Sequence, residues 1–381
     1  MMNEQDFDSI RPFRDDEIAP AIKQIVSNSK FQSVLDFLFP GEQDKYRKIF
    51  AQSKTVRDVQ RNFMHKVIYR ILAKSSDGLT NSGFDNYNEA GHIILSNHRD
   101  ILLDSGILNI ILMDEGFETA EITFGNNLII SPFFELTAKV NKMITVIRDG
   151  SPRELLFNSI RLSNYISNEI INRNNSVWVA QRPGRTKNGS DKTEISILKM
   201  LSFYKKDNFC EAIKNLDIIP LSISYEWEPC DIMKIRETYL SKQAAYVKKE
   251  QEDLQSTLGG IVSPKGRIHF AMGKPLNDFL DEIKTEKFNN DYLALVARQI
   301  DREIYKNYKL WPSNYLAYDL LEGIKTHDSQ YNNSTLLIFK KRFSAIDDYL
   351  PDGDKDELWN LFLHLYANPV YNFLATIENN I

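Results

Sequence analysis

The chain has 381 residues, enough for a large hydrophobic core and more than one structural unit. Its hydrophobic content of 42% and charged content of 26% are typical of globular proteins, and a net charge of −5 gives no general attraction to nucleic acid. The acidic, polar amino terminus predicts no secretory signal, and no uncharged apolar run is long enough to predict a transmembrane helix.

Residues 1–85 are expected to form an N-terminal helical region. Apolar residues recur at helical spacing around Ile22–Val26 and Val34–Leu38, where Pro40-Gly41 ends the pattern. A further helix is predicted over residues 56–73. Residues 74–91 are rich in Ser, Gly, Asn and Asp, which indicates a boundary before the next region.

Residues 86–280 are expected to form an α/β domain. Short apolar stretches predict strands at residues 92–95, 122–124, 144–147, 177–180, 217–224 and 267–270. Between them, helical patterns cover residues 105–113, 133–140, 153–172, 194–204 and 231–251. Strands that alternate with helices predict a mostly parallel sheet flanked by helices, with ligands beyond the carboxyl ends of its strands.

Residues 281–381 are expected to form a C-terminal helical region. Helices are predicted over residues 292–308 and 359–373, and Pro351-Asp352-Gly353 indicates a loop. The aromatic, apolar residues 358–374 are compatible with a helix packed on the domain or with a surface that contacts a membrane.

His98 is the first candidate catalytic residue, because it follows a buried type of strand in the polar sequence Ser-Asn-His-Arg-Asp. A histidine oriented by a carboxylate can act as a general base. Asp104 opens the next helical pattern and is one candidate partner, and Asp100 is the other. A loop histidine bonded to its own turn is the structural alternative.

Two basic segments are candidate anion sites. Arg148 ends a predicted strand, where its planar fork of donors can bind phosphate or form a surface ion pair with Asp149 or Glu154. Residues 181–192, here called the basic loop, read QRPGRTKNGSDK and follow another predicted strand. The glycines Gly184 and Gly189 allow close backbone approach. The cations of the loop, which form either a local anion site or a solvated surface, are Arg182, Arg185, Lys187 and Lys192.

Other chemistries lack their motifs in this sequence. No HExxH segment or metal-ligand cluster is present, so we expect no metal. The phosphate-loop motif and the GxSxG nucleophile elbow are also absent. The two cysteines, Cys210 and Cys230, form no CxxC motif, so a reduced cytoplasmic setting is expected, with a disulfide between them as the alternative.

Taken in order, these segments resemble the glycerolipid acyltransferase superfamily, which comprises glycerol-3-phosphate and 1-acylglycerol-3-phosphate acyltransferases. The resemblance covers roughly residues 90–280. The family has Asn-His and a following Asp after a strand, then Gly-(Asp/Asn)-Asn-Leu, a strand ending in Arg, a glycine-arginine block with a downstream Lys-Thr, a proline-bearing strand ending in Tyr-Glu, and a late Gly-x-Pro. The similar segments here are Asn97-His98 with Asp104, Gly125-Asn126-Asn127-Leu128, Val146-Ile147-Arg148, Gly184-Arg185-Thr186 with Lys192-Thr193, Pro220 to Tyr225-Glu226, and Gly273-Lys274-Pro275.

Two departures from the family pattern concern the candidate site. One extra residue separates His98 from Asp104, and Arg182-Pro183 stands where the family usually has Glu-Gly. The second departure turns an acidic position basic and leaves an amino-acid lipid open as the acceptor.

The resemblance implies transfer of a fatty acyl chain from acyl-CoA or acyl-carrier protein to a hydroxyl of a glycerol phosphate, with no other cofactor. His98 would be the general base and Asp104 its partner. The cations Arg148, Arg182, Arg185, Lys187 and Lys192 would bind the phosphate, and Gly184, Thr186 and Asn127 would line the substrate site. We expect a cytoplasmic protein, peripheral on the cytoplasmic membrane, that binds no nucleic acid. The competing hypotheses are a non-catalytic lipid-binding protein on this fold and a nucleotide-binding α/β enzyme without a phosphate loop.

Overall fold

A computed structural model describes residues 2–243, 252–283 and 290–378. Its centre is a seven-stranded sheet in the order β1-β7-β6-β2-β5-β3-β4. All neighbouring strands are parallel except β6 and β7. The strands are β1 Gly78–Ser82, β2 Ile93–Ser96, β3 Glu121–Gly125, β4 Met143–Val146, β5 Val177–Ala180, β6 Ile218–Tyr225 and β7 Arg267–Met272. The predicted mostly parallel sheet flanked by helices is confirmed.

Helices precede, interrupt and follow the sheet. The N-terminal helices are α1 Asp15–Ser27, α2 Ser29–Leu38, α3 Gln43–Ala51, α4 Val56–Asp58 and α5 His65–Ser75. The central helices are α6 Leu103–Asp114, α7 Pro132–Val140, α8 Pro152–Arg173, α9 Ile195–Leu201, α10 Phe209–Asn215, α11 Asp231–Gln243, α12 Glu252–Val262 and α13 Asn277–Glu282. The last helices are α14 Asn290–Lys306, α15 Pro312–Glu322, α16 Asn333–Ser344 and α17 Lys355–Glu378.

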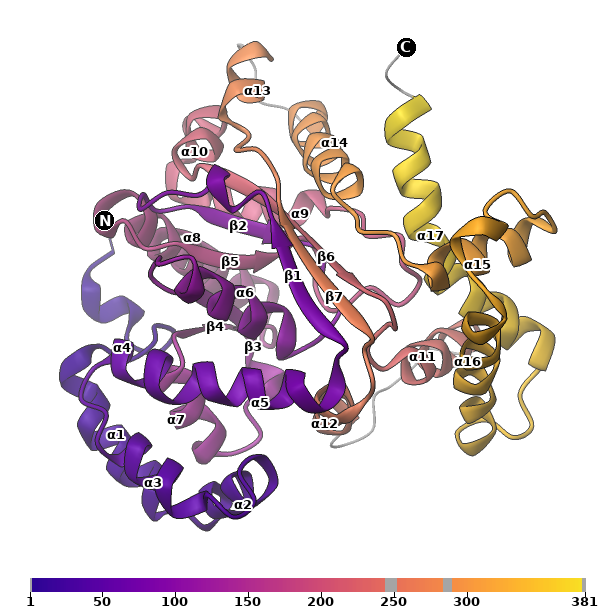
Figure 1. Ribbon diagram of the computed structural model, residues 1–381. Coiled ribbons are helices and arrows are strands. Elements are labelled where there is room, and N and C mark those ends of the chain that lie inside the picture. The colour runs from indigo at the N-terminus through magenta and orange to yellow at the C-terminus, as the bar shows by residue number, and fades with distance from the viewer. Residues whose placement is uncertain (1, 244–251, 284–289, 379–381) are drawn as a thin grey trace.

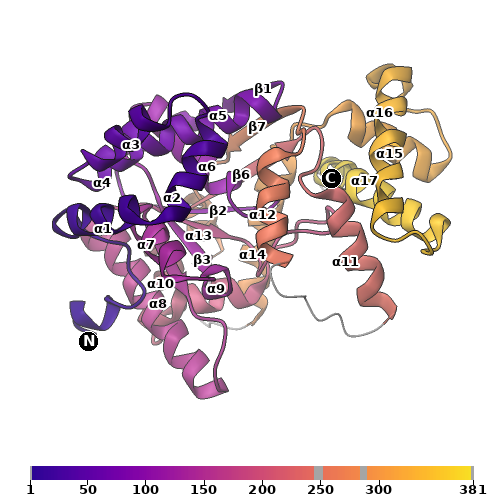
Figure 2. The same ribbon diagram turned by 90° about the horizontal axis from the view of Figure 1, so that it is seen from below.

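The helices cover the sheet as two layers, because side chains of a strand point alternately to its two faces. In β2, Ile94 belongs to an apolar cluster that includes residues of α1–α3, α5 and α6, whereas Ile93 and Leu95 belong to a second cluster with residues of α8, α9, α10 and α14. A third apolar cluster joins α11 to α15, α16 and α17. Figures 1 and 2 show these last three helices together at one side of the molecule, opposite α1, α2 and α3.

Local sequence accounts for the position of long helix α8. Ser151 and Glu154 form a capping box at its start, Pro152 occupies its first turn, and Asn174 ends it in the left-handed conformation. This helix connects β4 to β5, so its capping also fixes where the chain turns after Arg148.

The structure adds detail to the predicted elements. Strand β1 was not predicted, because it is polar and largely exposed at the sheet edge, where backbone pairing with β7 holds it. The helix predicted to start at residue 194 is split into α9 and a 3₁₀ turn, Ser202–Lys205. The helix predicted over residues 231–251 is found as α11, and residues 244–251 lie outside the described residues.

Candidate active site

The candidate residues converge because strands β2, β5, β3 and β4 run parallel. Their carboxyl ends therefore meet at one edge of the sheet. His98 lies two residues after β2, Arg182 two residues after β5, and Arg148 two residues after β4. The predicted placement of these three residues, each beyond the end of a strand, is confirmed.

Asp104 is the carboxylate that contacts the histidine. Its Oδ2 lies 2.9 Å from His98 Nδ1 and accepts backbone N–H bonds from Arg99 at 2.6 Å and Asp100 at 3.0 Å. Its Oδ1 accepts the hydroxyl proton of Tyr225 at 3.0 Å. Because a carboxylate only accepts, the bond to His98 places the ring proton on Nδ1 and leaves Nε2 able to take another.

Asp100 has a different place in the same loop. Its Oδ1 accepts backbone N–H bonds from Leu102 and Leu103 at 2.9 and 2.8 Å, which caps the start of α6. Its Oδ2 is buried and has no hydrogen-bond partner in the described part of the chain. Burial, reinforced by repulsion from Asp104, raises the pKa of Asp100. The geometry therefore pairs His98 with Asp104 and leaves Asp100 as a capping residue.

The imidazole of His98 is mostly enclosed but reaches the surface. Its side chain is 13% exposed, and its ring meets Trp178 edge-to-face with centroids 5.5 Å apart. Trp178 is in turn held by a 3.0 Å bond from its Nε1 to Ser96 Oγ. The enclosed ring can thus meet a substrate from one side while its other contacts fix its orientation.

The basic loop is bonded directly to the chain around His98. Backbone N–H groups of Gln181 and Thr186 donate to the carbonyls of Ser96 and His98 at 2.8 and 2.9 Å. Gly184 has φ +77°, with open space where a side chain would begin. These bonds place the glycine-arginine segment beside the histidine, as the sequence predicted.

The four cations of the basic loop differ in their partners. Arg182 Nε and Arg185 Nη1 are buried and have no hydrogen-bond partner among the described residues. Lys187 forms an ion pair with Glu237 of α11. Lys192 is exposed, and the backbone N–H of the next residue, Thr193, donates to Asp301 of α14. The two arginines therefore retain donor capacity for an anion.

Arg148 and Asn127 lie together beyond the carboxyl ends of β4 and β3. A side chain built on Gly125 would meet Asn127 Oδ1 at 2.3 Å and Arg148 Nε at 2.8 Å, so both side chains cover this glycine. Asn126 accepts the backbone N–H of Arg148 at 3.1 Å, which joins the ends of β3 and β4. The Gly-Asn-Asn segment thus explains where the arginine is presented.

The C-terminal helix α17 packs on the outer side of the basic loop. Side-chain amides of Asn368 and Asn372 donate to the carbonyls of Asn188 and Ser190 at 2.6 and 2.9 Å. Gly189, at φ +73°, is so close that a side chain there would meet the Leu365 carbonyl at 2.4 Å. The close approach at this glycine is therefore to a helix of the same chain.

Residues 358–374 are largely buried as part of α17. The buried apolar positions are Leu358, Leu361, Phe362, Leu363, Leu365, Tyr366, Ala367 and Val370. Of the two alternatives for this segment, a helix packed on the domain or a membrane-contacting surface, the structure has the packed helix.

Sequence reasoning missed several residues that organise the site. Tyr225 was seen only as a strand end, and its bond to Asp104 depends on β6 lying beside β2. The side-chain amide of Asn97 forms two hydrogen bonds with Ile223 of β6. Its Nδ2 donates to the Ile223 carbonyl at 3.0 Å, and its Oδ1 accepts from the Ile223 N–H at 2.8 Å. A short polar residue directly after a buried strand was the available signal for Asn97. Tyr225 stood in the resembling Tyr-Glu segment, but nothing local indicated its bond to Asp104.

Other expectations concern what the site contains. Cys210 and Cys230 are free thiols, which excludes the alternative disulfide. The described residues contain no group of His, Cys, Asp and Glu able to hold a metal ion. Nor is any described helix of sufficient length and apolarity to span a bilayer.

No family model matches this sequence, and no curated protein matches it. Among solved structures, the chain is similar to the 1-acyl-sn-glycerophosphate acyltransferase PlsC from Thermotoga maritima. The similarity has a TM-score of 0.36 and 13% identity, and it covers 77% of this chain and 97% of that chain. At this level of similarity, the functional assignment depends on the chain's own residues.

Proposed function

We propose that the protein transfers a fatty acyl chain from an acyl thioester to a hydroxyl of glycerol-3-phosphate or 1-acylglycerol-3-phosphate. The observation that carries this proposal is the His98–Asp104 pair beside a loop in which Arg182 and Arg185 each have one buried nitrogen without a hydrogen-bond partner among the described residues. A base and an anion site side by side suit an acceptor that has both a hydroxyl and a phosphate.

His98 acts as the general base in this reaction. Its Nε2 takes the proton of the acceptor hydroxyl while the oxygen attacks the thioester carbonyl. The tetrahedral intermediate collapses, the carbon–sulfur bond breaks, and the proton on Nε2 passes to the leaving thiolate. Asp104 keeps the ring oriented and stabilises the transient imidazolium, so the reaction requires no covalent acyl-enzyme and no cofactor beyond acyl-CoA or acyl-carrier protein.

The acceptor's phosphate is assigned to Arg182 and Arg185 after β5, with Arg148 contributing from the end of β4, two strands away in the sheet. Buried arginine donors without a protein partner are costly, and a phosphate would satisfy them with charge-assisted bonds. Lys187 and Lys192 contribute long-range attraction, since one is paired with Glu237 and the other is exposed.

Three uncharged residues are assigned to the substrate surface. Gly184 leaves open space beside Arg185 for a ligand to approach the backbone. Thr186 is buried next to His98, with an Oγ1 that lacks a hydrogen-bond partner in the described residues. Asn127 lies beside Arg148 over Gly125.

An amino-acid lipid is the second candidate acceptor. Arg182 occupies the position where the resembling family has glutamate, and no described residue donates a hydrogen bond to the buried Asp100 Oδ2. A zwitterionic acceptor would offer a carboxylate to the arginines and an ammonium to Asp100. The hydrogen bonds that join His98, Asp104 and Tyr225 favour a catalytic role, with either acceptor, over non-catalytic lipid binding.

Acyl donors reach the site from a membrane or a carrier protein. We therefore propose a cytoplasmic protein that is peripheral on the membrane, and flotation of the full chain with liposomes tests this placement.

Replacement of the base tests the proposed reaction. His98→Ala is expected to lower kcat about 10²–10⁴-fold, the usual contribution of a general base. His65→Ala is the matched control, because His65 also pairs with an aspartate, Asp114, at 2.8 Å, but at the opposite end of α6 from Asp104. Acyl transfer that is equal in wild type and folded His98→Ala would contradict the proposal.

A further inference from the structure

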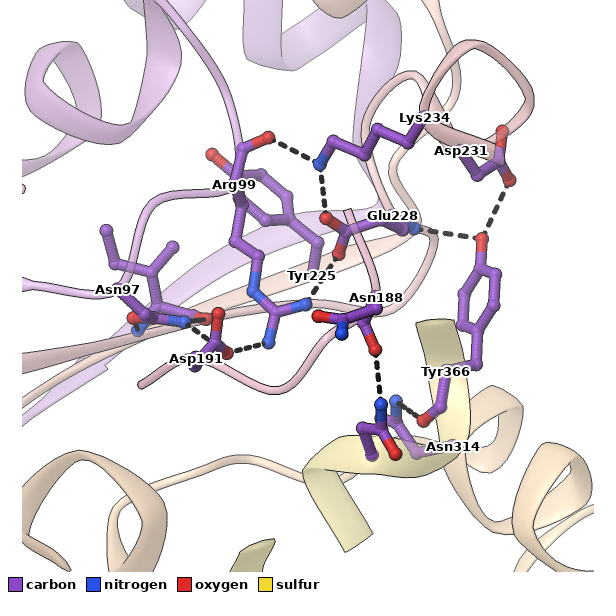
Figure 3. Close-up of polar contacts among 12 residues, drawn as sticks. Asn97, Arg99, Asn188, Asp191, Tyr225, Glu228, Asp231, Lys234, Asn314 and Tyr366 are labelled. Atoms are coloured by element: carbon purple, nitrogen blue, oxygen red, sulfur yellow. Dashed lines mark hydrogen bonds and ion pairs between the residues drawn. The ribbon is translucent and has the colours of Figure 1, made fainter. Parts of the chain in front are cut away.

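We propose that four buried charged residues act as positioning residues for the candidate base, a role that rests on the proposed function. They are Arg99, Asp191, Glu228 and Lys234, here called the ion cluster, and each is at most 4% exposed. Figure 3 shows the cluster between the end of β2, the basic loop and α17.

The ion cluster is a continuous chain of alternating charges. Arg99 donates from one terminal nitrogen to Glu228 at 3.0 Å and from the other to Asp191. Lys234 donates to the remaining oxygen of Glu228. Two cations thus balance two anions, and loss of any member would leave a buried charge uncompensated.

The members come from four separate segments that meet at the site. Arg99 directly follows His98, Asp191 lies near the end of the basic loop, Glu228 follows β6, and Lys234 is in α11. The cluster therefore ties the strand end that carries the base to the loop that carries the arginines.

The ion cluster also contacts both sequence neighbours of His98. Lys234 Nζ donates to the Arg99 carbonyl at 2.7 Å, while the Arg99 N–H is bonded to Asp104. On the other side, Asn97 Nδ2 donates to Asp191 at 3.2 Å. A shift of Asp191 or Lys234 would thus act on Asn97 or Arg99, the residues on either side of the candidate base.

A tyrosine supports the cluster from outside. Tyr308, after α14, donates its hydroxyl to Asp191 at 2.6 Å. Its removal deletes one hydrogen bond and keeps all four charges, so it perturbs the geometry more gently than a charge deletion does. Misplacement of a base by about 1 Å can cost about 10²-fold in rate, so small shifts in this cluster would register in kcat.

The test measures kcat, KM and a direct signal from His98 in the same variants. The signal is the Nδ1–H proton resonance of ¹⁵N-histidine-labelled protein, assigned as the resonance lost in His98→Ala. Tyr308→Phe is compared with the control variant Tyr165→Phe. The control also deletes a buried hydrogen bond, of 2.8 Å, from Tyr165 to Glu121 at the amino end of β3, away from the candidate site. Arg99→Lys and Arg99→Met form a second pair that separates charge from geometry.

Positioning predicts a graded loss in kcat with little change in KM. Tyr308→Phe should lower kcat about fivefold and shift the resonance, in keeping with one lost hydrogen bond. Arg99→Met should lower kcat about 10²-fold, with partial recovery in Arg99→Lys. Tyr165→Phe should change neither kcat nor the resonance, although it loses a similar bond.

Each outcome decides the proposal. Wild-type kcat and an unshifted resonance in folded Arg99→Lys and Tyr308→Phe would overturn it, and these two variants decide the question if Arg99→Met does not fold. A resonance shift in Tyr308→Phe alone, in a protein that acylates no acceptor, would support positioning while contradicting the proposed function. Equal effects of Tyr308→Phe and Tyr165→Phe would assign the cluster to stability alone.

Discussion

The two sides of the candidate site differ in how their polar groups are satisfied. On the base side, Asp104 accepts four hydrogen bonds and His98 is fixed through its ring and its backbone carbonyl. On the anion side, Arg182 and Arg185 each have a buried nitrogen without a hydrogen-bond partner among the described residues. The base is thus preorganised by the protein, whereas the arginines have capacity for a ligand.

Under the proposed function, this difference suits the two tasks of the site, a fixed base and an exchangeable anion. A general base must keep one orientation throughout the reaction, so bonds from several segments are an advantage. An anion site must exchange its ligand at every turnover, so saturated donors would weaken binding. Substitutions on the base side should therefore lower kcat, and substitutions on the anion side should raise KM for the acceptor.

The largest expected effect distinguishes the two aspartates. Asp104→Asn should lower kcat by about 10²–10⁴-fold, because an amide no longer selects the Nδ1–H tautomer or stabilises the imidazolium. Asp100→Asn should change kcat less than about fivefold, because its remaining oxygen can still cap α6. Steady-state kinetics of both variants checks this, and the reverse ranking would make Asp100 the partner.

The anion side is tested by a neutral substitute for Arg185. Arg185→Met should raise KM for the phosphate-bearing acceptor about 10- to 100-fold, the value of one charge-assisted hydrogen bond, with a much smaller change in kcat. Lys192→Met, at the exposed end of the same loop, should alter KM less than about twofold. An equal effect of both substitutions on KM would indicate general attraction in place of a defined phosphate site.

A smaller effect is expected from the hydroxyl behind Asp104. Tyr225→Phe removes the 3.0 Å bond to Asp104 Oδ1 and should lower kcat about fivefold, as for one lost buried hydrogen bond. Tyr87→Phe removes a buried 2.7 Å bond to Ser176 outside the base side and serves as the control. Comparison of kcat in the two variants separates support of Asp104 from general stability.

An effect on stability, and not on turnover, is expected where the basic loop is held at its far end. Asp301 accepts the Thr193 N–H at 2.8 Å, and burial raises its pKa from 3.8 to about 6. Between these values the folded protein binds more protons than the unfolded chain, so stability falls as pH rises, by at most about 3 kcal/mol. The Asp301→Asn variant should lack this loss of stability with rising pH, and urea unfolding at several pH values would measure the difference. A loss of stability equal to that of the wild type would assign the pH dependence to another group.

Local patterns in the sequence were sufficient for most of the sheet and for the location of the candidate base. Buried strands such as β2 and β5 are short and mainly apolar, and a histidine or arginine just after such a strand is visible without a structure. Polar β1 could not be found in this way, because its pairing with β7 is made by backbone atoms.

The support of the base could not be read from the sequence for a similar reason. The choice between Asp100 and Asp104 depends on how tightly the chain turns after β2, and both lie within reach by spacing. The ion cluster joins residues up to 135 positions apart, such as Arg99 and Lys234, so only the folded chain brings them together. Buried charges at such separations leave no periodic signal.

Mass spectrometry of products from competing acceptors tests the central claim most directly. One acyl thioester is offered to wild type and His98→Ala with glycerol-3-phosphate, 1-acylglycerol-3-phosphate and an amino-acid lysolipid together. We expect a new ester on a phosphorylated glycerol acceptor in the wild type and its near absence in His98→Ala. Product on the amino-acid lysolipid alone would transfer the assignment to the second acceptor, and no ester on any acceptor, or equal amounts from both proteins, would contradict His98 as the catalytic base.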